Sequence, residues 1–133
     1  FDKGIGDLFI IRVAGNTANP SSIASIEYAA ANLGTNLIVV LGHESCGAVG
    51  AAKDVVDNGT DYGPNLNHLI EFITPAVKAS AGEPMDKIVK CNASMNATAL
   101  TDNSAILKGL VDSGDVKIVS AYYNFVSGEV DFL

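Results

Sequence analysis

Residues 37–52 read LIVVLGHESCGAVGAA, an apolar run followed by a polar turn and a run of small residues. A continuous apolar run of this kind is typical of a strand covered on both faces, and the small residues after it predict a short helix. The turn between them carries His43 and Cys46. In open α/β sheets, ligands bind beyond the carboxyl ends of the strands, so this turn is the first candidate for a functional site.

The side chains in this turn have metal-binding chemistry. His43 and Cys46 are three residues apart, which allows an imidazole and a thiol to reach one metal ion, and these two ligand types together suit zinc. The alternative is a polar turn with a buried thiol, and the sequence leaves both open. Glu44 and Ser45 between them are either partners of the ligands or solvated. A zinc site would need at least a third protein ligand.

The second cysteine and the second histidine of the chain are weak candidates for that ligand. Cys91 falls on the apolar stripe of an expected helix, which favours a core thiol, because free cysteine is among the most buried residue types. His68 stands near the start of another expected helix, which favours a surface or capping role.

Outward from this turn, the sequence predicts one α/β domain over residues 1–133, with a mostly parallel sheet flanked by helices. Pro75 should kink or split one of the helices. The further strands are expected at residues 8–14 and 116–123, and residues 129–133 should return as a C-terminal antiparallel hairpin. The helices are expected at residues 20–33, 47–56, 66–80, 84–100 and 104–113.

Arg12 interrupts the apolar run of residues 8–14. A guanidinium in such a setting needs an anion or carbonyl oxygens as partners. The sequence leaves open whether Arg12 forms a structural ion pair or serves a ligand or an interface.

The composition excludes several function classes. Fifteen acidic and eight basic residues give a net charge of −7, which disfavours nucleic-acid binding. No apolar run approaches the roughly 20 residues of a membrane-spanning helix. Two cysteines argue against a disulfide framework and favour a reducing compartment. We therefore expect a cytoplasmic protein without a membrane partner, with the periplasm as an alternative because any signal peptide would precede Phe1.

Four separate segments of the chain resemble the β-class carbonic anhydrases. The resemblance covers essentially the whole chain in the order of the family, and it implies the family's fold. It also implies a zinc enzyme, a lyase, that interconverts carbon dioxide and bicarbonate as a homodimer or a higher homo-oligomer. The segments are GDLFIIRVAGN at residues 6–16, SIEYA at 25–29, GHESCGAV at 42–49 and AYYNFVSGEV at 121–130.

The resemblance also implies roles for the residues of the turn. In this family zinc is held by Cys, His and Cys, with water or hydroxide in the fourth position, and His43 and Cys46 match the second and third ligands. The first cysteine of the family belongs to a Cys-x-Asp-Ser-Arg segment that also supplies the Asp-Arg pair acting on the zinc-bound water. The chain contains no such segment. The resemblance therefore predicts a domain that is incomplete at its N-terminus, with weak zinc binding and little activity alone.

Three more residues are candidates for bicarbonate binding or for a structural role. Arg12 and Tyr123 match an arginine and a tyrosine that hold a non-catalytic bicarbonate in some relatives, although the chain lacks the accompanying tryptophan. Gly47 follows the cysteine ligand directly. Two other functions stay open at this stage. They are a non-catalytic interaction or scaffold protein that kept the fold, and a relative that hydrolyses carbon disulfide.

Overall fold

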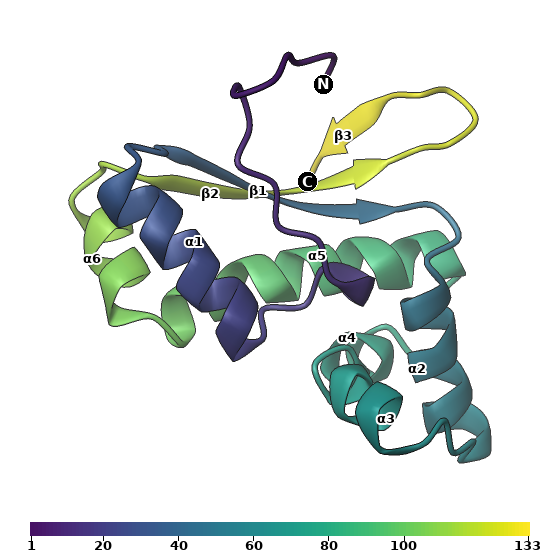
Figure 1. The fold of residues 1–133 in the computed structure, drawn as a ribbon. Helices are drawn as coiled ribbons and strands as arrows, with labels where there is room; N and C mark the ends of the chain where they lie inside the picture. The colour runs from purple at the N-terminus through teal and green to yellow at the C-terminus, as the bar shows by residue number, and fades with distance from the viewer.

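The computed structural model describes residues 1–133 as helices packed against one small sheet, with α5 lying directly on it (Figure 1). None of the helices combines the length and the apolar character needed to cross a bilayer. In chain order the elements are η1 (Ala14–Asn16), α1 (Pro20–Asn32), β1 (Leu37–His43), α2 (Gly47–Asn58), α3 (Pro64–Glu71), α4 (Thr74–Ala79), α5 (Met85–Asp102), α6 (Ala105–Asp112), β2 (Lys117–Tyr123) and β3 (Val130–Phe132).

The sheet has the strand order β1-β2-β3. Strands β1 and β2 are parallel, and the register places His43 opposite Tyr123 at their carboxyl ends. Strand β3 returns antiparallel to β2 and pairs Val130 with Tyr123. The predicted α/β fold with a C-terminal antiparallel hairpin is thus confirmed, and the described sheet is mixed.

The strand expected at residues 8–14 does not form. This segment runs from the N-terminus to η1 as a stretch without strand partners (Figure 1). Its side chains remain open to solvent, with Leu8, Phe9 and Ile10 exposed by 48%, 50% and 69%. A strand is defined by a ladder of hydrogen bonds to a neighbour, and β1 pairs only with β2. The prediction of a strand at residues 8–14 is therefore wrong for the described residues, because their apolar pattern has no neighbouring strand to pair with.

Pro75 splits the helix expected at residues 66–80, as predicted, because proline is tolerated only in a first helical turn. It stands in the first turn of α4, after α3 has ended at Glu71.

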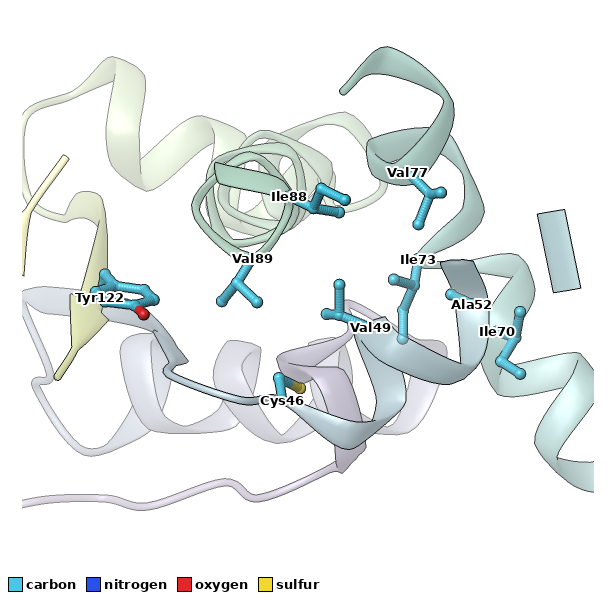
Figure 2. Packing of buried hydrophobic residues seen from close by; sticks show 9 residues of the cluster. All are labelled: Cys46, Val49, Ala52, Ile70, Ile73, Val77, Ile88, Val89 and Tyr122. Atoms are coloured by element: carbon cyan, nitrogen blue, oxygen red, sulfur yellow. The ribbon is translucent and has the colours of Figure 1, made fainter. Parts of the chain in front are cut away.

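The apolar core consists of two clusters, and α5 contributes to both. One cluster joins α2, α3, α4 and α5 to the end of β2 (Figure 2). The other joins α1, α5 and α6 to the sheet. The first contains Cys46, Val49, Ala52, Ile70, Ile73, Val77, Ile88, Val89 and Tyr122. The second contains Ala18, Ile23, Ile38, Val40, Leu100, Leu107 and Val116.

Helix α5 approaches β1 closely next to the candidate site. A Cβ atom at Gly42 would lie 2.9 Å from Cγ1 of Val89, so only glycine lets the helix pack at this depth. Because Gly42 directly precedes His43, this contact fixes the end of the strand that carries the imidazole.

Two buried asparagines of α5 hold the loop around η1. The side chain of Asn92 donates from Nδ2 to the carbonyl oxygen of Gly15 at 2.9 Å, and the backbone N–H of Ala18 donates to Oδ1 of Asn96 at 2.7 Å. Nδ2 of Asn96 donates in turn to Oδ1 of Asn92 at 3.0 Å. This network satisfies buried backbone groups that a loop could not satisfy by itself.

Candidate metal centre

The candidate metal ligands stand at the two ends of one tight turn. His43 is the last residue of β1, and Cys46 is the N-cap residue of α2. Ser45 between them adopts a left-handed backbone conformation with φ of 55°, which reverses the chain within two residues. The turn therefore places an imidazole and a thiol where the strand ends and the helix begins.

One ring nitrogen of His43 already has a partner. Nδ1 lies 2.8 Å from the backbone carbonyl oxygen of Glu44. A carbonyl oxygen only accepts hydrogen bonds, so Nδ1 carries the proton and donates it. In the neutral ring Nε2 then keeps its lone pair, and this is the tautomer that metal-ligating histidines commonly show.

Cys46 is a free thiol that packs in the first core cluster. Its residue surface is only 4% exposed, and it lies near Val49 and Val89 at the start of α2 (Figure 2). Packing against these apolar side chains holds Cys46 in place.

The chain does not bring a third ligand to this pair. No group of three or more His, Cys, Asp or Glu side chains in residues 1–133 could hold a metal ion. His68 is a surface residue of α3, as predicted, and its Nδ1 lies 3.2 Å from Oε2 of Glu71. Cys91 is only half-buried and belongs to neither core cluster, so the prediction of a core thiol is wrong. His43 and Cys46 fit part of a zinc site by their chemistry, and the remaining ligand is not among the described residues.

A largely apolar groove of about 960 Å³ lies beside His43. Its walls are the segment before η1, η1 itself, one side of α1, the strand β1 and the end of β2. Arg12 and Tyr123 line this groove together with His43, whereas Cys46 and Gly47 do not. Three of the residues that the sequence singled out therefore line one groove.

Neither an ion pair nor close packing within residues 1–133 accounts for Arg12 and Gly47, two of the candidate residues. Arg12 is exposed and has no carboxylate partner, so no ion pair among residues 1–133 accounts for it. A Cβ atom at Gly47 would meet nothing within 4 Å, and packing gives no reason for glycine there.

The turn between β2 and β3 packs against His43. The backbone N–H of Phe125 donates to Oε2 of Glu44 at 3.0 Å, and the backbone N–H of Glu44 donates to the carbonyl oxygen of Tyr123 at 2.9 Å. The Phe125 ring stacks on the imidazole with centroids 5.4 Å apart and planes inclined by 28°. Sequence reasoning missed Phe125, because Glu44 and Phe125 are 81 positions apart and only the β1–β2 register brings them together.

Tyr122 is the buried phenol nearest in sequence to this turn. Burial raises its pKa, and the carboxylates of Glu44, Asp86 and Asp131 add to the shift. The phenol therefore stays neutral at neutral pH. The Lys90 ammonium lies 4.6 Å from the ring centroid, as in a cation–π contact.

Comparison with known proteins identifies one family. A sequence profile described as carbonic anhydrase matches residues 1–130. Carbonic anhydrase 2 of Mycobacterium tuberculosis is 33% identical over 131 residues, which cover 96% of this chain and 63% of the relative. The carbonic anhydrase of Mycolicibacterium smegmatis is 34% identical over 135 residues, which cover 98% of this chain and 65% of the relative. The chain thus spans less than two thirds of the length of these relatives.

Solved structures share the fold. The Coccomyxa β-carbonic anhydrase in complex with acetazolamide superposes with a TM-score of 0.81 at 22% identity, over 97% of this chain and 62% of that one. A chain from the tetrameric β-carbonic anhydrases of Sordaria macrospora gives a TM-score of 0.79 at 20% identity, over 98% of this chain and 70% of that one. At these identities the likeness supports the fold alone.

Proposed function

This chain belongs to the β-class carbonic anhydrases, and we propose that it forms the larger part of a zinc enzyme that reversibly hydrates carbon dioxide to bicarbonate. The observation that carries the proposal is the state of His43. Its Nδ1–H is committed to the Glu44 carbonyl, its Nε2 is left for a metal, and Cys46 follows at the next helix start.

Nε2 of His43 and the thiolate of Cys46 would be two of the zinc ligands. Zinc, when bound, supplies a Lewis acid that lowers the pKa of water toward neutrality. The role of His43 is to offer a neutral imidazole in a fixed tautomer. The role of Cys46 is to offer a thiolate, whose negative charge the metal compensates within an apolar surrounding.

The third ligand, in this proposal, comes from a strand outside residues 1–133 that lies in the groove beside His43. Two features support that position. The edge of β1 opposite β2 has no strand partner, and the side chains of the facing segment, such as Phe9 and Ile10, are exposed. Unpaired strand edges and open apolar side chains are what an added strand would cover. The relatives are longer than this chain, and in them such a strand could come from the part that this chain does not match.

Arg12 and Tyr123 belong to the proposal as anion contacts. Both line the same largely apolar groove, and the Arg12 guanidinium has no carboxylate partner. An unpaired guanidinium beside apolar walls favours an anion such as bicarbonate. Gly47 stays a proposed substrate-side or structural residue next to Cys46. A homo-oligomer is also proposed, and the tetrameric enzymes of Sordaria macrospora support it by analogy.

The test compares the 133-residue chain with the same chain fused at Phe1 to a strand segment containing Cys-x-Asp-Ser-Arg. We expect the fused chain to bind one zinc ion and to hydrate carbon dioxide, because three protein ligands then surround the metal. Stopped-flow measurement follows the hydration. The chain alone should bind zinc weakly and show little activity.

The matched control is the fusion in which the cysteine of the added segment is replaced by serine. It should fold like the parent fusion and lose tight zinc binding. A folded fusion without zinc would contradict the proposed function. Tight zinc binding and full activity of the unfused chain would contradict the proposed source of the third ligand.

A further inference from the structure

We propose that Glu44 and Phe125 are positioning residues that hold the His43 imidazole in the orientation needed for metal binding. This inference rests on the proposed function, because it assigns the two residues to the ligand His43. Neither side chain offers itself as a ligand. Oε2 of Glu44 accepts the Phe125 backbone N–H, Glu44 belongs to no group of three metal-ligand side chains, and Phe125 has no metal-ligating atom.

Glu44 acts on both partners at once. Its backbone carbonyl accepts the Nδ1–H of His43 at 2.8 Å, which fixes the tautomer and one edge of the ring. Its carboxylate accepts the backbone N–H of Phe125 at 3.0 Å, which ties the turn after β2 to the turn after β1. A carboxylate on a backbone N–H is a charge-assisted hydrogen bond, which is stronger than a neutral one.

Phe125 acts on the face of the imidazole. Its ring stacks on His43 and meets Tyr123 edge-on, with centroids 5.5 Å apart in the second contact. The residue remains 55% exposed, so burial of its own surface explains its position poorly. The hydrogen bond at Nδ1 acts in the plane of the imidazole and the stacked ring acts across it. Together they restrict rotation about both side-chain torsions of His43.

The turn that carries Phe125 is itself well defined. Oδ1 of Asn124 accepts the backbone N–H groups of Val126 at 2.8 Å and Ser127 at 3.0 Å. The backbone N–H of Gly128 donates to the carbonyl oxygen of Asn124 at 2.9 Å, and Gly128 takes the left-handed conformation that such a turn requires. Phe125 is thus presented by a hydrogen-bonded turn.

The experiment follows the ring signals of both histidines by NMR in the metal-free 133-residue chain. Zinc affinity is then measured in the same chain fused to the Cys-x-Asp-Ser-Arg segment. Phe125→Leu should remove the ring-current shift of the His43 protons and raise the zinc dissociation constant by about tenfold, the effect typical of losing an outer partner of a ligand. Glu44→Ala should move the same signals, because Phe125 loses its anchor. Phe125→Tyr keeps an aromatic ring and should retain the parent signals and affinity. Glu44→Gln keeps a side-chain oxygen that accepts the Phe125 backbone N–H, and it should retain them as well.

Two controls accompany these variants. Glu129→Gln removes a charge from the same turn without touching His43 and should change neither readout. His68, exposed on α3, serves as an internal reference whose signals should stay fixed. A purely structural role would lower the melting temperature while leaving the His43 signals in place. Unchanged His43 signals in both Phe125→Leu and Glu44→Ala would overturn the inference. A parent fusion that binds no zinc at all would count against the metal site, whereas the metal-free signals would still decide the positioning role.

Discussion

Replacing His43 with alanine should lower the zinc affinity of the fused, zinc-binding form by more than about 100-fold. Losing only an outer partner of a ligand costs up to about 100-fold, and losing the ligand itself should cost more. Carbon dioxide hydration should fall to the uncatalysed rate. The reason is that His43 offers the only ring nitrogen left free at the end of β1, and the described residues hold no substitute. Chelator competition measures the affinity, and stopped-flow hydration measures the activity.

The chain supplies matched controls for this result. His68→Ala removes the other histidine, which is exposed and contacts Glu71 and Phe72, and it should leave zinc binding unchanged. Cys46→Ser and Cys91→Ser form a second pair, in which only the former should weaken zinc binding. Parent-like zinc affinity in a folded His43→Ala protein would show that the metal site lies elsewhere.

Asn96→Ala should lower the free energy of unfolding by about 3 kcal/mol, a large part of the roughly 5–15 kcal/mol of a typical domain. The substitution leaves the backbone N–H of Ala18 buried without an acceptor and removes the donor to Oδ1 of Asn92. Each buried polar group that loses its partner costs about 1–3 kcal/mol. Urea denaturation followed by circular dichroism gives the value.

Thr98→Ala on the same helix is the control for Asn96→Ala. Thr98 is exposed and its hydroxyl donates only to the carbonyl oxygen of Ser94, so its loss should change the stability by less than about 0.5 kcal/mol. Equal effects of the two substitutions would show that the buried network does not stabilise the loop around η1.

The sequence predicted the parts of the fold that depend on local pattern. The continuous apolar run at residues 37–41 formed β1, and the small residues after Cys46 formed α2. Pro75 split its helix because a missing N–H acts within one turn. These features need only the periodicity and the backbone chemistry of neighbouring residues.

Features that depend on distant partners could not be predicted. Residues 8–14 have the composition of a strand, yet hydrogen-bonded pairing depends on a neighbour that the pattern does not reveal. The buried pair of Asn92 and Asn96 looked like ordinary helix sequence, and its partners lie about 77 residues away. Such contacts exist only once the helix has packed on the loop.

The candidate site divides in the same way. His43 and Cys46 could be found because three residues separate them in one turn. The contacts of Glu44 and Phe125 could not, because they follow from the register of β1 and β2. The groove that both Arg12 and Tyr123 line likewise arises from the path of the segment before η1 across the sheet (Figure 1).

The coordination shell of bound zinc tests the central claim most directly, and X-ray absorption at the zinc edge of the fused protein measures it. The account predicts a mixed shell around the zinc ion. The nitrogen of His43 should lie about 2.0–2.1 Å from the zinc, and the sulfur atoms of Cys46 and the added cysteine about 2.3 Å from it. The nitrogen scattering should change in His43→Ala and persist in His68→Ala. A shell of oxygen and nitrogen without sulfur, or a shell unchanged by His43→Ala, would contradict the account.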